Sequence, residues 1–566
     1  MVSRRIQRVL LLSNGFGGAT MAAYCWLRDR GIQTAFQPVG SPEAMVEAHR
    51  WYGPDLVFAP TLTTRVPDEL LGRVVINHPG RLGDRGASSI DWGRCRREPF
   101  GGTTLLLAAA GWDTGDIVHT STFRYPAGPA TKSWIYAYQN RAAMLAGLER
   151  VVADPPPDPR PLDYEHSDVL GRWNDVLRQD DCTVDWSLPA EEVVWRVAAR
   201  DGAPGVRTAL LGHPVHVFDA HPAGPCRGDQ GEVVGWLADS AIQVATGPVR
   251  GDGRRDSVWI GHVKTDFKQP AAWWLRDVLG YLPAWQGDPA SYRPVVTRRR
   301  GPVAVITAAA YNGAWSTGFC HAVASSITAA ARRTDVDQIV LRGGGGGPFG
   351  NGINLNHVYA SRAGLVPEAQ ANIRAINEVA LAMFQARRDG VSVIALLDGD
   401  AGAGGAFLSL CADVVVAVPG RTFNYHYVGM GGLTGSEFHT LTLPARLPDE
   451  QSRADLLLDC LPLSAYQAHR QGLVDYLAPD GLAGDDLTEW VHELAVNHRD
   501  VGKRAGRARW RPLPTEAELA ATQARELARI DRDFASPEFQ SAVANFVRKR
   551  ATAPPTAAIE YRGAYA

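Results

Sequence analysis

The sequence has little cysteine, little net charge and no long apolar run. Its 566 residues include seven cysteines, which are scattered and never spaced as CxxC. This argues against a disulfide framework and against a metal site, and it favours a reducing cytoplasmic location. The net charge of −2 gives no bulk field that would attract nucleic acid or a membrane. The apolar run in the opening MVSRRIQRVLLLSNG is too short for a signal or membrane segment.

The length is too great for a single hydrophobic core, so two to four domains are expected. Near the N-terminus, strand-like apolar runs alternate with helical patterns, which predicts an α/β domain with a parallel, doubly wound sheet over residues 1–152. The predicted strands cover residues 8–12, 33–38, 56–60, 74–76 and 103–109.

A glycine turn after the first predicted strand raises the question of nucleotide binding. Gly15 and Gly17 match the start of a G-x-G-x-x-G fingerprint, but Thr20 stands at the third glycine position. The second strand also ends without an acidic residue that would bind a ribose. Dinucleotide binding is therefore not expected.

Two polar residues follow predicted strands in this domain and are candidates for acid–base chemistry. His78 ends a strand in Asn77-His78-Pro79, and Asp113 lies in the later turn Trp112–Gly115. A histidine and a carboxylate so placed can steer a proton at a carbonyl, although each alone is more often an ordinary turn residue.

Together these motifs resemble the formyltetrahydrofolate-dependent formyltransferases, whose fold is Rossmann-like. The resemblance implies that His78 and Asp113 are catalytic and that N10-formyltetrahydrofolate is a co-substrate. It departs from the family at three places: Ile76 where the catalytic Asn is expected, Met21-Ala22 where a Gln-Arg pair is expected, and 127–131 where a basic stretch is expected. Folate-binding positions implied by the resemblance are Gly83, Asp84, Arg85, Lys132 and Ser133.

A Pro-rich segment, 153–161, is typical of a linker. Short strands in residues 163–270 then predict a small β-barrel that resembles the C-terminal, OB-like subdomain of formyltransferases. Residues 271–300 are predicted to be a second linker.

Two glycine-rich loops, 343–352 and 399–405, each follow an apolar predicted strand. Glycine allows a backbone N–H to approach a carbonyl oxygen closely, so two such loops can form an oxyanion hole. Flexible connectors would look similar when taken singly. The pairing of the loops favours the oxyanion hole.

This region, residues 301–477, resembles the crotonase (enoyl-CoA hydratase/isomerase) superfamily. The resemblance implies oxyanion donors at the N–H groups of Ile353 and Gly404, with Gly352 and Gly405 near coenzyme A. The two catalytic glutamate positions of hydratases are Phe407 and Tyr427 here, so ordinary hydration is not expected. Tyr427 and Glu437 remain as proton carriers. The crotonase domain is predicted over 301–495, with a C-terminal helical extension and tail over 496–566.

A formyltransferase followed by a crotonase resembles the HypX (HoxX) family of hydrogenase maturation proteins. This resemblance implies formyl transfer to coenzyme A, decarbonylation of formyl-CoA to CO, and a partner in the hydrogenase maturation machinery. The matching segments are His78–Trp92, Trp112–Gly115, Phe218–Pro222, Tyr311–Thr317, Asn351–Asn356, Gly399–Gly405, His426–Glu437 and Cys460–Ala465.

Two alternatives remain open at the level of sequence. One is a biosynthetic enzyme with another formyl donor, acceptor or acyl-CoA, which the departures near the folate site favour. The other is a non-catalytic scaffold that keeps only the fold, against which the presence of His78, Asp113, Tyr427 and Glu437 speaks.

Overall fold

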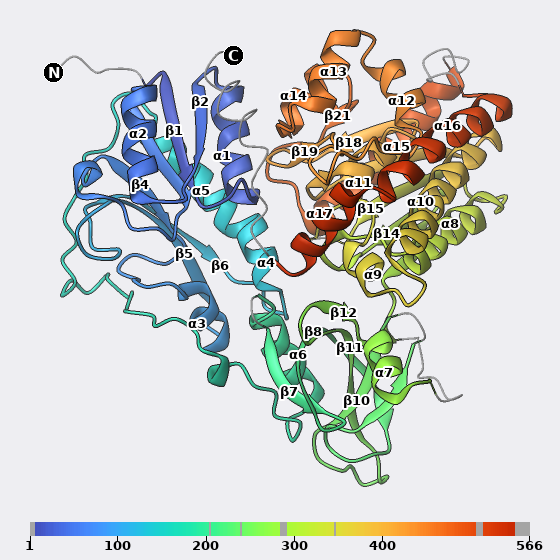
Figure 1. The fold of residues 1–566 in the computed structure, drawn as a ribbon, viewed down its shortest axis with the longest axis horizontal. Coiled ribbons are helices and arrows are strands. Elements are labelled where there is room, and N and C mark those ends of the chain that lie inside the picture. The colour runs from blue at the N-terminus through green and yellow to red at the C-terminus, as the bar shows by residue number, and fades with distance from the viewer. Residues whose placement is uncertain are drawn as a thin grey trace. The chain divides into compact units, whose positions relative to one another are not determined.

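The computed structural model describes residues 6–202, 205–237, 240–282, 291–344, 347–504 and 513–549, without the side chains of 498–504. The chain divides into two compact units, with the boundary between Tyr292 and Arg293 (Figure 1). The α/β architecture agrees with the fold class predicted from the sequence. Most of the predicted tail, residues 550–566, lies outside the described residues.

The first unit opens with a six-stranded sheet in the order β2-β1-β3-β4-β5-β6. Strands β1 to β4 are parallel, but β5 runs antiparallel to β4, and β6 antiparallel to β5. The prediction of a parallel sheet is therefore wrong for β5, the last of the predicted strands, which runs antiparallel to β4. Strand β6, which was not predicted, returns directly beside β5 without a crossover helix. The bounds are β1 Arg8–Ser13, β2 Gln33–Pro38, β3 Leu56–Thr61, β4 Val74–His78, β5 Phe100–Leu107, β6 Ile117–Arg124, α1 Gly18–Asp29, α2 Pro42–Tyr52, α3 Ser89–Cys95, α4 Lys132–Ile135 and α5 Arg141–Val151.

Residues 160–177 form a strap over this sheet domain. The strap begins where Ile117 and Arg160 exchange backbone hydrogen bonds. Further on, Gly171 N–H donates to Leu82 O, and Arg85 exchanges bonds with Arg172 and Asn174. Assigning residues from 163 onward to the β-barrel subdomain was therefore wrong for this part.

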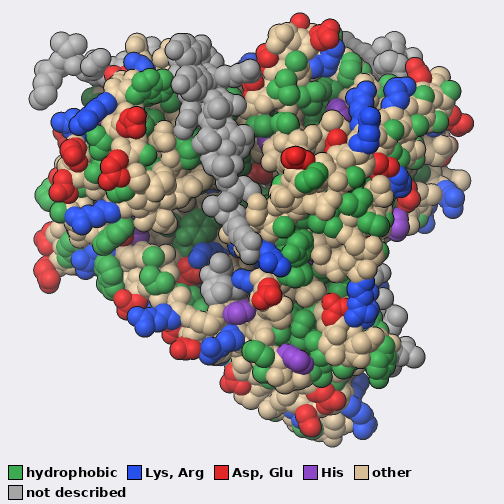
Figure 2. Space-filling view, viewed as in Figure 1, with side chains coloured by type: hydrophobic (Ala, Val, Ile, Leu, Met, Phe, Trp, Pro, Cys, Tyr) green, Lys and Arg blue, Asp and Glu red, His purple; other side chains and the backbone are tan. Residues whose placement is uncertain are grey.

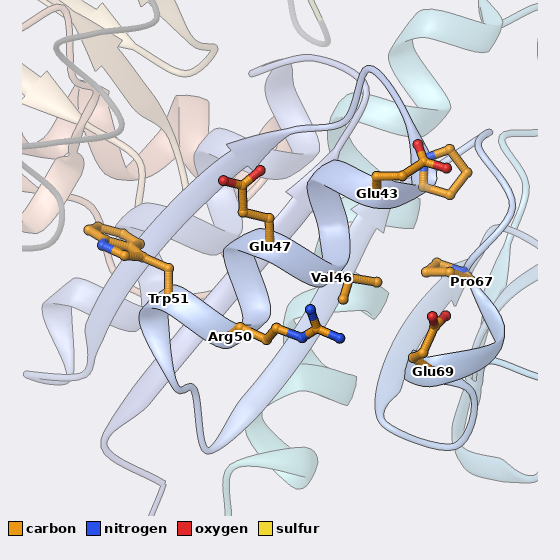
Figure 3. A pocket seen from close by; sticks show the side chains of 8 residues that line it. Glu43, Val46, Glu47, Arg50, Trp51, Pro67 and Glu69 are labelled. Atoms are coloured by element: carbon orange, nitrogen blue, oxygen red, sulfur yellow. The ribbon is translucent and has the colours of Figure 1, made fainter.

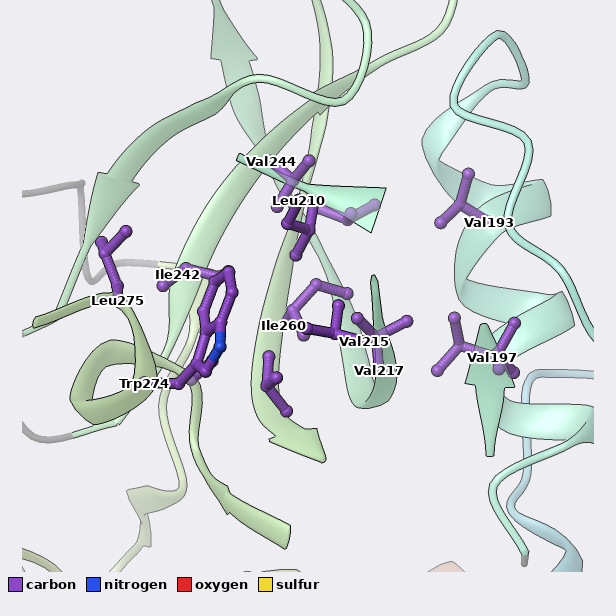
Figure 4. Packing of buried hydrophobic residues seen from close by; sticks show 14 of the residues in the cluster. Val193, Val197, Leu210, Val215, Val217, Ile242, Val244, Ile260, Trp274 and Leu275 are labelled. Carbon is purple, nitrogen blue, oxygen red and sulfur yellow. The ribbon is translucent and has the colours of Figure 1, made fainter. Parts of the chain in front are cut away.

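The small β unit is an antiparallel sheet in the order β7-β8-β11-β10-β9, with β12 paired to β11. Its core lies between two helices: Figure 4 shows Val193 and Val197 of α6 on one side of the strands and Trp274 and Leu275 of α7 on the other. Since Trp274 is 4% exposed, α7 is part of this core. The bounds are α6 Ala190–Ala199, β7 Val206–Leu210, β8 His213–Cys226, β9 Val233–Trp236, β10 Ile242–Thr246, β11 Arg255–Lys264, β12 Lys268–Pro270 and α7 Ala271–Leu279.

The prediction of a linker over 271–300 is thus wrong at both ends, where the chain forms a helix and a strand. Helix α7 completes the first unit, and β13, Val295–Arg300, is an edge strand of the second. Residues 283–290 lie outside the described part of the chain.

The second unit contains a six-stranded sheet in the order β13-β14-β15-β16-β18-β21 and a small sheet in the order β17-β19-β20. Apart from β13, the large sheet is parallel. Its strands β14, β15, β16 and β18 are mostly buried, as expected for strands covered on both faces. The strands are β14 Val303–Ala308, β15 Gln338–Gly343, β16 Ser392–Leu397, β17 Ala401–Gly402, β18 Val414–Ala417, β19 Thr422–Asn424, β20 Leu463–Ser464 and β21 Tyr476–Leu477.

Helices α8, α10 and α16 pack beside one another in this unit (Figure 1). The domain boundary predicted at 495/496 falls inside α15, which is therefore continuous with the crotonase-like part. The helices are α8 Thr317–Ala331, α9 Leu355–Ala360, α10 Leu365–Arg388, α11 Ala403–Ser409, α12 His439–Arg446, α13 Glu450–Leu458, α14 Ala465–Arg470, α15 Gly484–Arg504, α16 Glu516–Phe534 and α17 Pro537–Val547.

Basic and acidic side chains are interspersed on the face shown in Figure 2. Among the described helices, none is both long and apolar enough to cross a membrane.

Candidate active sites

The first candidate site is a histidine–carboxylate pair at the end of β4. His78, which is 4% exposed, places Nδ1 3.4 Å from Asp113 Oδ1. The other carboxylate oxygen of Asp113 accepts the Gly86 N–H at 2.9 Å. Burial alone raises the pKa of Asp113, but the bonds from His78 and Gly86 and nearby positive charge outweigh it, so the pKa is lowered. The carboxylate is thus held ionised beside the ring, where it can orient the ring.

The far nitrogen of His78 faces polar partners that sequence reasoning missed. Nε2 lies 3.4 Å from Ser89 Oγ, and Ser89 Oγ accepts from Asn174 Nδ2 at 3.2 Å. Asn77, the residue before His78, instead donates to Pro60 O at 3.0 Å. Asn174 lies in the strap, about a hundred residues along the chain, and nothing local in the sequence signals its position.

The loop Gly83–Gly86 is engaged with the strap. Asp84 accepts the N–H groups of Arg81 and Arg172, each at 3.0 Å, and Asn174 Nδ2 at 3.3 Å. A Cβ on Gly83 would lie 2.4 Å from a Val169 methyl group. The guanidinium carbon of Arg85 lies 4.6 Å from the centre of the Tyr164 ring. In this structure Gly83, Asp84 and Arg85 hold the strap, and a folate-binding role for them stays a prediction.

Lys132, the other predicted folate contact, is already paired. Its Nζ donates to both oxygens of Asp91 at 2.8 and 2.7 Å, and its backbone N–H donates to Asp201 Oδ1 at 2.8 Å. Burial raises the pKa of Asp201 to about 6. Ser133, its neighbour, is exposed.

The second candidate site is built from the two glycine loops that the sequence singled out. They lie against each other: a Cβ on Gly352 would stand 3.1 Å from Gly404 N, and one on Gly405 would stand 2.1 Å from Gly350 O. Ile353 and Trp315 form a parallel β-bridge. In this bridge the Trp315 N–H donates to Gly352 O, and Trp315 O accepts the Asn354 N–H. The Gly404 N–H lies in the first turn of α11, where a helix leaves its N–H groups without an intrahelical acceptor. Among the backbone hydrogen bonds that the described loops make, none comes from the Ile353 N–H, so both groups are suited to receive a ligand oxygen.

Tyr427 and Glu437 meet directly beside these loops. The Tyr427 hydroxyl donates to Glu437 Oε2 at 2.6 Å, and a Cβ on Gly404 would lie 2.2 Å from Glu437 Oε1. Glu437 is 1% exposed. Burial, helped by the charge of Glu526 and opposed by the Tyr427 bond, raises the pKa of Glu437 to about 7. Burial and the Glu437 charge raise the pKa of Tyr427 well above its ordinary value.

An aromatic cluster encloses this pair. Phe407, at a hydratase glutamate position, stacks on Tyr427 with ring centres 4.7 Å apart. His439 lies 5.4 Å from the Tyr427 ring and 5.2 Å from that of Phe407. Hydratases are expected to have a second carboxylate at this position. In this chain the apolar ring of Phe407 occupies that space instead. His439 was missed because a lone histidine on a helix carries no sequence signal.

A surface hollow of about 690 Å³ lies along α2. Figure 3 shows that Glu43, Glu47, Arg50 and Trp51 line it together with residues of the Pro67–Glu69 turn. None of the predicted site residues contributes to it.

Comparisons with known proteins agree with this division of the chain. Residues 176–274 match the formyl transferase C-terminal domain family and residues 301–553 the enoyl-CoA hydratase/isomerase family. The chain is 33% identical to the hydrogenase maturation factor HoxX of Bradyrhizobium diazoefficiens, covering 96% of this chain and 95% of that protein.

A solved structure and a further relative extend the comparison. The structure of HypX from Aquifex aeolicus in complex with tetrahydrofolic acid is 29% identical, covers 99% of both chains and has a TM-score of 0.87. The chain is also similar to a methionyl-tRNA formyltransferase of Syntrophus aciditrophicus, 27% identical over 37% of this chain and 69% of that protein.

Proposed function

The chain belongs to the HypX/HoxX family of hydrogenase maturation factors, and we propose that it transfers a formyl group from N10-formyltetrahydrofolate to coenzyme A and splits the resulting formyl-CoA into CO and free coenzyme A. The CO would serve hydrogenase maturation as a ligand of the nickel–iron site. The observation that carries this proposal is the buried Tyr427–Glu437 pair, with one oxygen of Glu437 against Gly404.

In the first unit, His78 and Asp113 handle the proton of formyl transfer. The thiol sulfur forms a bond to the formyl carbon, the bond from that carbon to N10 breaks, and the thiol proton ends on N10. The ionised Asp113 beside Nδ1 stabilises His78 when the ring carries that proton in transit. A relative of the same family binds tetrahydrofolic acid, which supports folate as the formyl carrier.

In the second unit, Glu437 takes the proton of the formyl carbon while the carbon–sulfur bond breaks and the electron pair leaves with sulfur. Tyr427 then gives its hydroxyl proton to the thiolate and recovers one from Glu437. Since the charge of Glu437 is one cause of the raised pKa of Tyr427, neutralising Glu437 makes this donation easier. The net result is one proton moved from carbon to sulfur.

The glycine loops fit a thioester carbonyl. The N–H groups of Ile353 and Gly404 would hold its oxygen, and each such donor is worth about 3 kcal/mol. A side chain at Gly404 would collide with Glu437, so only glycine lets the carbonyl and the carboxylate be neighbours.

A second candidate function is a tailoring enzyme with a different formyl donor. One observation favours it: Lys132 is occupied by Asp91, so it does not offer a free cation to a folate in this conformation.

The experiment is CO release, trapped by haemoglobin, first from N10-formyltetrahydrofolate plus coenzyme A and then from formyl-CoA alone. We expect CO from both, and losses of about 100-fold or more with formyl-CoA in Tyr427→Phe and Glu437→Gln, as for removal of a proton-transfer group. If CO forms from formyl-CoA but not from the folate mixture, the decarbonylation stands and the formyl donor is a compound other than N10-formyltetrahydrofolate. No CO from either mixture, or unchanged release in both variants, would refute the proposal.

A further inference from the structure

The backbone that carries Glu437 is held in an unfavourable conformation. Glu437 and Phe438 are consecutive left-handed residues with φ of 60° and 57°. Such conformations cost free energy for residues other than glycine, and they persist only where surrounding contacts fix them. The contacts that fix this turn therefore determine where the Glu437 carboxylate points.

One of these contacts comes from α10. Asn377, which is 0% exposed, accepts the Glu437 N–H at 3.1 Å and donates to Ser436 Oγ at 2.9 Å. Its amide thus fixes the entry to the turn. Phe438 is fully buried and packs edge-to-face on Phe384 of the same helix, with ring centres 5.6 Å apart.

The exit of the turn is held by a carboxylate from the C-terminal helix α16. Glu526 is 1% exposed. Its Oε2 accepts the Phe438 N–H at 2.9 Å, and its Oε1 accepts the N–H and the hydroxyl of Thr440 at 2.9 and 2.6 Å. These N–H groups belong to the start of α12, which has no side-chain cap of its own. Glu526 is therefore the N-terminal cap of α12, supplied by a distant helix.

We propose that Glu526 is a positioning residue of the second site, whose buried carboxylate clamps the Glu437 turn and whose charge sets the electrostatic environment in which Glu437 works. The proposal rests on the decarbonylation described above. A buried carboxylate is costly unless hydrogen-bonded, and a neutral side chain would cap a helix almost as well. A carboxylate therefore stands here where a neutral amide would suffice for capping, and this points to an electrostatic part.

The charge of Glu526 shifts the pKa values of several ionisable groups around it. It adds to the burial that raises the pKa values of Glu437, Tyr427 and Cys411. His439 of α12, whose Nδ1 lies 3.5 Å from Glu526 Oε1, has a pKa lowered by burial and by Arg529, with Glu526 opposing the shift. Removing the charge should therefore let Glu437 ionise at lower pH.

The test is Glu526→Gln, which keeps the shape of the side chain, with Glu516→Gln on the exposed start of α16 as matched control. With formyl-CoA we expect kcat to fall about tenfold and KM to change less than about twofold, since the loss lies in the chemical step. The acid limb of the pH profile should move to lower pH. The control should match the wild type in all three quantities.

Hydrogen exchange of the Phe438 and Thr440 amides, measured without substrate, separates this proposal from the proposed function. We expect faster exchange at both amides in Glu526→Gln. If the wild type releases no CO from formyl-CoA but these two amides exchange faster in Glu526→Gln, the proposed decarbonylation is wrong and the clamp is still supported. If the two amides exchange as slowly in Glu526→Gln as in the wild type, the clamp is wrong. If kcat falls but the acid limb of the pH profile stays where it is in the wild type, the electrostatic part of the proposal is wrong. Should Glu526→Gln not fold, Thr440→Val removes one hydroxyl donor to the clamp and is expected to lower kcat about threefold.

Discussion

At the scale of single residues, the second site depends on how one carboxylate is buried. Glu437 is excluded from water and lies near Glu526, and its carboxylate accepts the Tyr427 hydroxyl at 2.6 Å and the Ser436 N–H at 3.1 Å. Burial raises its pKa to about 7, from an ordinary value of 4.5. A base whose pKa lies near the working pH is present in its ionised form and still holds a proton well, which is the compromise that general-base catalysis needs.

This gives a prediction for the pH dependence of CO release. If Glu437 is the base, kcat/KM for formyl-CoA should be level above about pH 7 and fall about tenfold for each pH unit below it, because only the ionised form accepts the proton. The measurement is initial CO release between pH 5 and about pH 9, with enzyme-free blanks at each pH. Glu437→Gln should give a low, flat profile. A wild-type rate that rises as the pH falls would show that Glu437 acts as an acid instead.

The residues with distinctive chemistry were predictable from the sequence, and their supporting partners were not. Tyr427 and Glu437 stand in a motif between glycines, and His78 and Asp113 end strands or lie in turns, so local patterns identify them. Asn377 and Glu526 are polar residues inside long helices, where most such residues face solvent. Their positions follow only from tertiary packing, which one sequence does not display.

At the scale of elements, the strap 160–177 changes how the first site is understood. Composition predicted a linker up to 161 and a barrel domain from 163 onward. In the structure, the strap's backbone pairs with Leu82 and Arg85 and brings Asn174 to Ser89. Backbone pairing of an irregular segment leaves no periodic pattern in its side chains, which is why the sequence did not predict it.

Gly171→Ala tests this element. A Cβ there would lie 2.0 Å from Asp84 N and 2.1 Å from Gly83 C, so the strap must move away from the loop that bonds to Asp113 through Gly86. We expect formyl-CoA formation to fall about 100-fold, as for a misplaced catalytic group. Release of CO from formyl-CoA should be unchanged. Gly251→Ala, with nothing within 4 Å of the added atom, is the control. Wild-type formyl transfer in Gly171→Ala would show that the strap is not needed.

At the scale of the whole molecule, the chain is two compact units that meet in sequence at Tyr292 and Arg293. The prediction of a formyltransferase part followed by a crotonase part is confirmed, because motifs of both families are local and specific. The linker at 271–300 was wrong for a physical reason. Trp273 and Trp274 on α7 are core residues of the first unit, whereas the Arg-rich 298–300 only appears linker-like because β13 is an edge strand with exposed side chains.

Because each unit has its own candidate site, the two proposed reactions should be separable within one chain. His78→Gln removes the proposed proton carrier of the first site, so no CO should form from N10-formyltetrahydrofolate and coenzyme A. Release from added formyl-CoA should stay within about twofold of the wild type, as for sites without shared partners. Glu437→Gln should do the reverse and let formyl-CoA accumulate, which mass spectrometry can follow against free coenzyme A. If His78→Gln also abolished CO release from formyl-CoA while the protein remained folded, the two sites would be coupled and the division of labour between the units would be wrong.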